Sequence, residues 1–240
     1  MKKVAIVTGA SRGIGAATAR LLGARGYAVA VAYHFQKAKA EEVAHSMENA
    51  IIVQADMGVE GNITRLFETV DKQLGPVTAL VNNAAINLKS GSGTVEEMPW
   101  EDVESVFKTN VVGVFASCRE AVKRMKVAGG GAIVNVSSEA GRFGGNKMTH
   151  YAASKAAVNT FTVAFAREAA AHKIRVNAVS PGVIDTGVHG ENPERLATLR
   201  ASLPLGRMGK PEEVAETIVW LLSDAASYVS GSILTVAGAR

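Results

Sequence analysis

The sequence is short of several residue types, and each shortage excludes a class of protein or site. The 240 residues include one cysteine, Cys118, so an intrachain disulfide framework and a metal site built from several cysteines are excluded. The five histidines show no metal-ligand spacing, and we expect no bound metal. No apolar run approaches the length of a membrane span, and the short run after Met1 leads into a glycine motif instead of a cleavage site. We therefore expect a cytoplasmic protein without a membrane partner.

Aromatic residues and clustered positive charge are also scarce. Aromatic residues make up 5% of the chain against 48% hydrophobic residues, so the core must come from Ala, Val, Ile and Leu, which suits buried parallel strands. The formal net charge is +4, but Lys and Arg are interleaved with Asp and Glu almost everywhere. A nucleic-acid binder normally clusters its cations, so we expect no nucleic-acid partner. Cys118 lies in an apolar stretch, which predicts a buried, unreactive thiol.

The order of apolar patterns along the chain predicts the fold class. Aliphatic runs predict strands at residues 4–8, 28–33, 51–54, 79–82, 132–137, 175–179 and 233–236. Helical spacing is found at residues 16–25, 38–47, 63–73, 103–125, 152–171 and 212–222. Strands that alternate with helices pair in parallel through right-handed crossovers. We therefore predict an α/β fold, a single Rossmann-type domain over residues 1–240 with a doubly wound, seven-stranded parallel sheet flanked by helices.

One long stretch does not fit this pattern. Residues 184–208 follow a predicted strand, are comparatively polar and contain His189, Gly190 and Pro193. A loop of that length in a compact domain is usually a lid or a substrate loop. We predict that residues 184–208, together with residues 87–95, determine which substrate is bound.

The first predicted strand leads directly into the motif Thr8-Gly9-Ala10-Ser11-Arg12-Gly13-Ile14-Gly15, and a helix follows. Gly9 and Gly13 tolerate a positive φ and let backbone N–H groups approach a pyrophosphate closely, and Gly15 lets the helix pack against the strand. The helix N-terminus favours an anionic phosphate. A glycine pattern between the first strand and a helix therefore predicts a dinucleotide-binding site.

The end of the second predicted strand bears on the form of the dinucleotide. An acidic residue at this position binds the ribose 2′-hydroxyl and favours NAD. This sequence has Tyr33 and His34 instead, with Lys37 and Lys39 just beyond, and Arg12 of the glycine loop is near the same place. A site with basic side chains and no carboxylate suits the 2′-phosphate of NADP. We therefore predict NADP as the preferred cofactor, with NAD as the alternative. An exposed helix face is the competing interpretation of the two lysines.

Tyr151 and Lys155 are four residues apart in a predicted helix, so their side chains share one face. A tyrosine with a pKa near 10 is a poor acid or base at neutral pH, and a nearby ammonium lowers that pKa. Such a tyrosine exchanges a proton with an alcohol or a developing alkoxide. Position strengthens this weak motif, because the preceding strand ends in Ser137 and Ser138 at the sheet edge where ligands bind. A serine hydroxyl there stabilises charge on a substrate oxygen.

With these motifs in order, the sequence resembles the short-chain dehydrogenase/reductase family over nearly the whole chain. The resemblance selects Ser138 over Ser137, because the family's serine lies thirteen positions before the tyrosine. It implies that Ser138 holds the substrate oxygen, that Tyr151 is the acid or base, and that Lys155 lowers the tyrosine pKa and positions the ribose. It also implies that Asn110 supports a water relay to Lys155.

Further motifs extend the resemblance to the cofactor site. Asp56 matches an acid near the adenine, the run from Asn82 to Ala85 matches a segment that passes beside the cofactor, and the run from Pro181 to Thr186 matches one along the nicotinamide. The implied cofactor-binding residues are Gly9, Ser11, Arg12, Gly13, Ile14, Gly15, Tyr33, His34, Asp56, Met57, Asn83, Ala84, Ala85, Tyr151, Lys155, Pro181, Gly182, Ile184 and Thr186.

We therefore predict an NADPH-dependent carbonyl reductase or alcohol dehydrogenase acting on a small molecule. The stretch from Leu205 to Val214 resembles 3-oxoacyl-carrier-protein reductases and sugar 1-dehydrogenases, which are the alternative activities, whereas the ending Val236-Ala237-Gly238-Ala239-Arg240 departs from the family's usual DGG. A dinucleotide-sensing module without chemistry is the alternative outside the enzymes. Helices 103–125 and 152–171 are apolar on more than one face, and the family commonly forms tetramers through them, so we expect a homotetramer.

Overall fold

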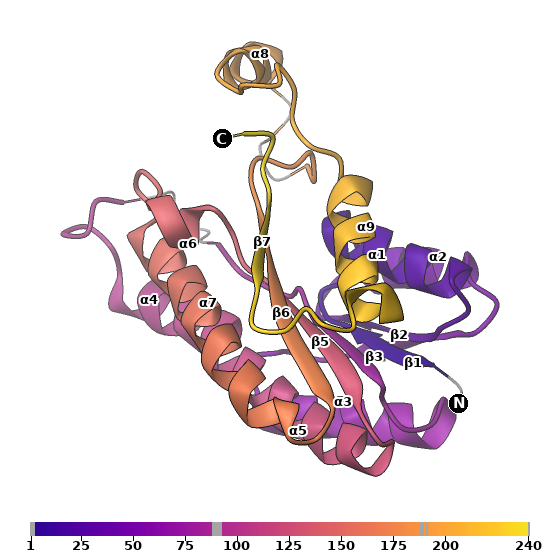
Figure 1. Cartoon of the computed structure of the whole chain (residues 1–240). Coiled ribbons are helices and arrows are strands. Elements are labelled where there is room, and N and C mark those ends of the chain that lie inside the picture. The colour runs from indigo at the N-terminus through magenta and orange to yellow at the C-terminus, as the bar shows by residue number, and fades with distance from the viewer. Residues whose placement is uncertain (1–2, 88–92, 188–189, 191, 240) are drawn as a thin grey trace.

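The structure, a computed structural model, describes residues 3–87, 93–187, 190 and 192–239 (Figure 1). Its strands are β1 (Val4–Val7), β2 (Ala28–Tyr33), β3 (Ala50–Gln54), β4 (Ala79–Asn82), β5 (Gly131–Val136), β6 (Ile174–Pro181) and β7 (Ile233–Val236). They form one seven-stranded sheet in the order β3-β2-β1-β4-β5-β6-β7. Every neighbouring pair is parallel, for example Val7 opposite Val31 and Asn82 opposite Asn135. The predicted doubly wound α/β sheet is confirmed.

Helices cover both faces of the sheet. The described helical segments are α1 (Gly13–Ala24), α2 (Lys37–His45), α3 (Glu60–Gln73), α4 (Trp100–Phe107), η1 (Lys108–Val112), α5 (Gly113–Val127), α6 (Ala140–Phe143), α7 (Thr149–Ala170), α8 (Pro193–Ala201), α9 (Pro211–Leu222) and η2 (Asp224–Ala226). Helices α3, α5 and α7 pack on one face around a core that includes Phe67, Met125 and Ile133. Helices α1, α2 and α9 pack on the other face around Leu22 and Ile218, as Figure 1 shows.

Two predicted elements differ from the structure for a local reason. The segment 103–125, predicted as one helix, contains α4, the π-helical turn η1 and α5. A π-turn adds one residue to a helical turn and commonly marks a functional position; hydrophobic periodicity does not detect such a change. The predicted strand 132–137 begins one residue earlier and ends at Val136, so Ser137 and Ser138 follow the strand.

The predicted loop 184–208 contains a helix. Residues 193–201 form α8, which lies beyond the carboxyl ends of β6 and β7, beside the C-terminus in Figure 1. Three apolar side chains of the segment, Ile184, Leu203 and Met208, are buried, so this stretch is not purely a surface loop. Residues 188, 189 and 191, including His189, lie outside the described residues, as do residues 88–92 of the second expected substrate segment.

Candidate active site

The glycine loop follows β1 and turns into α1. Gly9 and Gly13 have φ values of +62° and +56°, as predicted for glycine at these positions. A Cβ on Gly9 would lie 2.9 Å from the Cα of Ala84, and one on Gly13 would lie 3.1 Å from Cγ2 of Thr186. The loop is therefore in close contact with the segments that follow β4 and β6. No side chain caps α1 and no acidic residue lies in its first turn, which leaves that end suited to an anion.

Thr8 and Asn83 hold the glycine loop against the end of β4. The backbone N–H groups of Asn83 and Ala84 each donate to Oγ1 of Thr8 over 3.0 Å. The Asn83 side chain donates to the carbonyls of Thr8 and Gly9 over 2.9 and 3.1 Å. A Cβ on Gly15 would lie 2.5 Å from Nδ2 of Asn83, so this glycine makes room for the Asn83 amide as well as for the packing of the helix. Thr8 is a residue that the predicted site omits, although the motif includes it.

The carboxyl ends of β2 and β3 lie beside the loop. The Tyr33 side chain is buried in the core on the α1–α2 face, which directs it away from solvent. His34 is exposed, and its Nε2 lies 3.8 Å from Oδ2 of Asp56. Asp56 also accepts a hydrogen bond of 2.8 Å from the backbone N–H of Gly58. Lys37 pairs with Glu41 at 3.5 Å on the exposed face of α2, which supports the competing interpretation of this lysine.

The segment after β6 borders the loop from the other side. Pro181 is the last residue of β6, and the N–H of Gly182 donates to the carbonyl of Val236 in β7 over 3.0 Å. Ile184 is buried and pairs with Gly209 in an isolated bridge. Thr186 packs against Gly13. The ends of β1, β4, β5 and β6 are neighbours in the sheet, so the predicted cofactor segments meet at one edge.

The two adjacent serines after β5 have different partners. Ser137 is buried and its Oγ donates to the backbone carbonyl of Lys155 over 3.2 Å. Ser138 Oγ accepts from the N–H of Ala140 over 3.2 Å, and the hydroxyl is hydrogen-bonded to the phenol of Tyr151. Both side chains therefore reach α7. The alternation of side chains along a strand does not apply to this pair, because β5 ends at Val136.

Tyr151 and Lys155 lie on one face of α7, as their spacing predicts. Nζ of Lys155 is 5.7 Å from the centre of the Tyr151 ring. It also donates a 2.7 Å hydrogen bond to the carbonyl of Val136, the last residue of β5. Burial lowers the pKa of Lys155 to about 8. The pKa of Tyr151 is raised by burial, with the Ser138 hydrogen bond acting in the opposite direction. The sequence predicts that Lys155 lowers the pKa of Tyr151. In the structure that pKa is raised, because burial has the largest effect.

Asn110 lies in the π-helical turn η1 and is fully buried. Its side chain exchanges two hydrogen bonds with the backbone of Ile86, of 2.9 and 3.0 Å, and donates a third, of 3.1 Å, to Oγ of Ser154. Ser154 in turn donates to the carbonyl of Tyr151 over 2.7 Å. The structure therefore connects Asn110 to the start of α7 through Ser154, and its side chain bonds to neither Tyr151 nor Lys155.

Comparison with known proteins agrees with this arrangement. The family described as Enoyl-(Acyl carrier protein) reductase matches residues 9–238. The chain is 46% identical over 247 residues to the uncharacterized oxidoreductase YgfF of Escherichia coli, covering 99% of each chain. The chain belongs to the short-chain dehydrogenase/reductase family. It is therefore an oxidoreductase that acts on hydroxyl or carbonyl groups of small molecules, with NAD(H) or NADP(H) as cofactor.

Other members of the short-chain dehydrogenase/reductase family among its relatives act on different substrates. The chain is 40% identical to cis-4-hydroxycyclohexanecarboxylate dehydrogenase of Sinomonas cyclohexanicum, with 99% of this chain and 96% of the relative covered. It is 36% identical to 3-oxoacyl-(acyl-carrier-protein) reductase FabG of Staphylococcus aureus, with 99% and 98% covered. These names share the alcohol–carbonyl chemistry and differ in substrate.

The residues at the sheet edge fit the dinucleotide that short-chain dehydrogenases/reductases use. At Gly9 and Gly13 the loop lies so close to the neighbouring segments that a Cβ would crowd them, so only backbone occupies these positions. No side chain accepts a hydrogen bond from the N-terminus of α1. These features suit a pyrophosphate. The buried ammonium of Lys155 suits ribose hydroxyls, and it lies on the same edge. The glycine loop, Asn83–Ala85 and the segment from Pro181 to Thr186 would hold the dinucleotide.

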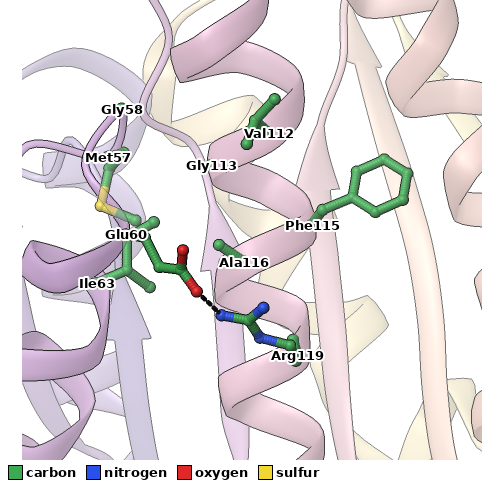
Figure 2. Close-up of a pocket in the computed structure, with 9 residues that line it drawn as sticks. All are labelled: Met57, Gly58, Glu60, Ile63, Val112, Gly113, Phe115, Ala116 and Arg119. Carbon is green, nitrogen blue, oxygen red and sulfur yellow. Dashed lines mark hydrogen bonds and ion pairs between the residues drawn. The ribbon is translucent and has the colours of Figure 1, made fainter.

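A separate cavity of about 260 Å³ lies between α3 and α5 and shares only Met57 with the predicted cofactor residues. In Figure 2, Met57, Glu60 and Ile63 face Ala116 and Arg119 across it, and Glu60 pairs with Arg119. The Phe115 ring points away from the centre of the cavity, and it contacts the ring of Phe161 of α7 at a tilt of 40°, with 4.0 Å between ring centres. None of the four predicted catalytic residues lines this cavity.

Three further side chains test or extend the sequence analysis. Cys118 is buried, as predicted, and burial raises its pKa to about 12, which disfavours the reactive thiolate. His150 is buried, at 5% exposure, and neither ring nitrogen has a hydrogen-bond partner among the described residues. Gly141 was not predicted. A Cβ there would lie 2.7 Å from the backbone of Lys155, so this glycine lets α6 pack directly against α7.

Two other expected absences concern metals and membranes. Within the described parts of the chain, no group of three or more His, Cys, Asp or Glu side chains is arranged to hold a metal ion. Among the same residues, no helix has both the length and the apolar character that crossing a membrane requires.

Proposed function

We propose that this chain is an NADPH-dependent carbonyl reductase and alcohol dehydrogenase whose reaction is carried by Ser138, Tyr151 and Lys155. The observation that carries the proposal is the convergence of three groups: the Ser138 hydroxyl lies within reach of the Tyr151 phenol, and the buried Lys155 ammonium lies 5.7 Å from the centre of the Tyr151 ring. These three groups lie after β5 and on α7, at the edge where the glycine loop lies after β1. A hydroxyl donor and a proton donor then converge on one substrate oxygen.

In the direction of reduction, a nicotinamide held at this edge would supply the hydride that the carbonyl carbon receives. The Ser138 hydroxyl hydrogen-bonds the carbonyl oxygen and stabilises the negative charge that develops on it. Tyr151 gives its phenolic proton to that oxygen, so the carbonyl becomes an alcohol and the tyrosine becomes a phenolate. Lys155 would position the ribose beside this tyrosine, and the proton of Tyr151 is then replaced from solvent. In the direction of oxidation, the phenolate accepts the proton of the alcohol.

Asn110 contributes by position in this proposal. Its three hydrogen bonds fix the backbone of Ile86 and the Ser154 side chain, which holds the first turn of α7 where Tyr151 lies. The π-turn η1 is what brings this amide to the interior. The predicted water relay through Asn110 to Lys155 stays a proposal.

The preference for NADPH is supported at the end of β2. His34 and the exposed Arg12 are the basic residues beside the predicted ribose site, and position 34 has no carboxylate to bind a 2′-hydroxyl. Asp56 is close, but it accepts from Gly58 and faces His34. A 2′-phosphate suits the guanidinium of Arg12 because the two groups form paired, charge-assisted hydrogen bonds.

The experiment is an assay of NADPH and NADH oxidation with 3-oxoacyl thioesters, ketones, quinones and aldehydes, and of NADP⁺ reduction with sugars and cyclic alcohols. The 3-oxoacyl thioesters are included because of the Staphylococcus aureus relative, and cyclic alcohols because of the Sinomonas relative. We expect turnover with NADPH and loss of at least about 1,000-fold in kcat for Tyr151→Phe. Tyr228→Phe, which changes a fully exposed tyrosine, serves as control. A Tyr151→Phe variant with full activity would exclude the proposal, and cofactor binding without turnover would favour the sensing module.

We also propose that the chain forms a homotetramer. Exposed apolar side chains lie on α4, η1 and α5, at Trp100, Val112 and Phe115, and a second group lies around β7, at Tyr228 and Ile233. Apolar exposure of this kind is typical of an interface between subunits. Light scattering after size-exclusion chromatography measures the mass, and a monomer at micromolar concentration would contradict the proposal.

A further inference from the structure

A chain of buried hydrogen bonds joins the middle of the sheet to α7. Nδ2 of Asn82 in β4 donates to Oδ1 of Asn135 in β5 over 2.9 Å. Nδ2 of Asn135 donates to Oγ1 of Thr162 in α7, also over 2.9 Å. The Thr162 hydroxyl donates to the carbonyl of Val158 over 2.8 Å. Asn135 and Thr162 have no exposed surface, and Asn82 is 4% exposed. These groups therefore have no water to replace a lost partner.

The direction of the chain is determined by its last bond. The Thr162 hydroxyl has one proton, which it donates to the Val158 carbonyl. In its contact with Asn135, Oγ1 of Thr162 must therefore be the acceptor. The Asn135 amide nitrogen therefore points at α7 and its oxygen points at Asn82. Only one orientation of the Asn135 side chain can accept from Asn82 and donate to Thr162 at once. The Asn135–Thr162 bond therefore forms in only one position of α7 on β5.

The positions of the two residues relate this bond to the active site. Asn135 directly precedes Val136, whose carbonyl accepts from Lys155, and lies three residues before Ser138. Thr162 lies seven residues after Lys155 and eleven after Tyr151, which is about two and three helical turns. The sheet-facing side of α7 thus presents Thr162, Lys155 and Tyr151 to Asn135, Val136 and Ser138 in the same order.

The apolar contacts between α7 and the sheet define the position of α7 on β5 less sharply than the Asn135–Thr162 hydrogen bond does. The buried core on this face uses Val158, Ala166 and Ala169 from α7, and Phe161 and Phe165 of the same helix pack against it; none of these apolar side chains forms a directional bond to the sheet. Burial of apolar surface is non-directional, so a small slide or rotation of α7 changes it little. A buried amide–hydroxyl bond is directional, and displacement leaves its groups unpaired.

We propose that Asn135 and Thr162 are positioning residues, and that their hydrogen bond sets the register of α7 on β5 and thereby places the Tyr151 phenol at the Ser138 hydroxyl. This inference rests on the proposed function, since it assigns a role only if Ser138 and Tyr151 perform the reaction. Neither residue touches the substrate; both act through α7.

The first test removes the Thr162 hydroxyl with little change in shape, in Thr162→Val. We expect kcat to fall about tenfold, because a small displacement of reacting groups has a large effect on rate. We expect the KM for NADPH to change by less than about twofold, since the glycine loop is on other elements. We also expect the midpoint of the pH–kcat profile to move to higher pH, because the Ser138 hydrogen bond lowers the pKa of Tyr151 and a displaced α7 weakens it.

The pH midpoint separates positioning from mere stability. A partly unfolded sample has a lower rate at every pH and an unchanged midpoint, so a lower rate with an unmoved midpoint would overturn the inference. Thr162→Ser restores the hydroxyl, and we expect it to return kcat and the midpoint towards those of the unchanged protein. Failure of this rescue would also overturn the inference.

Two more variants complete the design. Ser117→Ala is the matched control, because Ser117 is fully buried in α5 and bonds its own helix, donating to the Gly113 carbonyl over 2.8 Å. We expect it to leave the pH midpoint unchanged. Combining Asn135→Ala with Thr162→Val should lower kcat no further than the more damaging single change, because both remove one bond. Additive losses would overturn the inference.

The outcome is distinguishable from failure of the proposed function. If Tyr151→Phe retains full activity, the proposed function fails whatever Thr162→Val does. If Tyr151→Phe is inactive while Thr162→Val keeps the kcat and pH midpoint of the unchanged protein, the proposed function stands and the positioning role of Asn135 and Thr162 is rejected.

Discussion

The Ser138 hydroxyl is hydrogen-bonded to the Tyr151 phenol, and this contact opposes the effect of burial on the tyrosine. Burial favours the neutral phenol and raises its pKa, whereas a hydrogen bond to the phenolate favours the charged form. Burial is the larger of the two effects. The serine therefore has two roles in the proposed reaction: it binds the substrate oxygen, and it limits how far the tyrosine pKa rises.

The adjacent serines allow a direct test of this relationship. We expect Ser138→Ala to lower kcat by about 100-fold, because one hydrogen bond to developing charge is lost. Removing the contact that lowers the Tyr151 pKa should also move the midpoint of the pH–kcat profile to higher pH. Ser137→Ala is the control, since Ser137 bonds the backbone of Lys155 and not the Tyr151 side chain, and we expect it to lower kcat by about tenfold or less. Equal losses in the two variants would contradict the assignment of Ser138.

The sheet and the glycine loop were predictable because their signals are local. Buried parallel strands are continuous aliphatic runs, so all seven strands were located within a few residues. Gly9 and Gly13 stand where the backbone needs a positive φ, and glycine is the residue that adopts it without strain. The spacing of Tyr151 and Lys155 likewise determines that they share one face of α7.

Other features depend on three-dimensional packing and were not predictable from local patterns. The π-turn around Asn110 leaves the apolar spacing of its helix almost unchanged. The presence of Lys155 four residues after Tyr151 suggested a lowered tyrosine pKa, but the depth of burial at α7 decides the direction. Helix α8 has few buried contacts and a polar sequence, so no apolar periodicity marks it within residues 193–201.

The buried ammonium of Lys155 makes the stability of the fold depend on pH. Burial lowers its pKa from 10.5 to about 8, so between these values the unfolded chain binds more protons than the folded one. Stability from this group therefore rises with pH across that window and is lowest below pH 8. The cost of the buried charge is about 3 kcal/mol at pH 7, at about 1.4 kcal/mol for each pKa unit.

We therefore expect Lys155→Met to be inactive and yet more stable than the unchanged protein at pH 7. The gain is about 2 kcal/mol, since the lost hydrogen bond to the Val136 carbonyl offsets about 1 kcal/mol. The gain should shrink as the pH rises from about 8 towards 10.5. Urea unfolding of both proteins at several pH values measures it, with Lys39→Met, an exposed lysine of α2, as control. A difference that stays constant with pH would contradict the argument.

Gly141 tests whether α6 must rest directly on α7. A Cβ at this position would lie 2.7 Å from the carbonyl carbon of Lys155 and 2.8 Å from the nitrogen of Ala156, and backbone atoms do not move aside easily. We expect Gly141→Ala to destabilise the fold by about 1 to 3 kcal/mol and to lower kcat, because Ser138 is displaced from Tyr151. Gly61→Ala in α3 is the matched control, since a Cβ there meets nothing within 4 Å. Thermal unfolding and kcat of the two variants should differ clearly, and similar behaviour would argue against the close approach.

In the proposed function the cofactor preference depends on Arg12, and removing the charge of Arg12 or of Lys37 tests this proposal. We expect Arg12→Ala to raise the KM for NADPH by about tenfold or more, because a charge-assisted pair with the 2′-phosphate is lost, and to leave the KM for NADH within about twofold. Lys37→Ala removes a cation that is paired with Glu41 on the exposed face of α2, and we expect it to affect the two cofactors equally. Steady-state kinetics with both cofactors for the three proteins give the ratio directly. If Arg12→Ala weakens NADH as much as NADPH, the guanidinium binds the shared pyrophosphate, and the preference for NADPH must come from His34 or be absent.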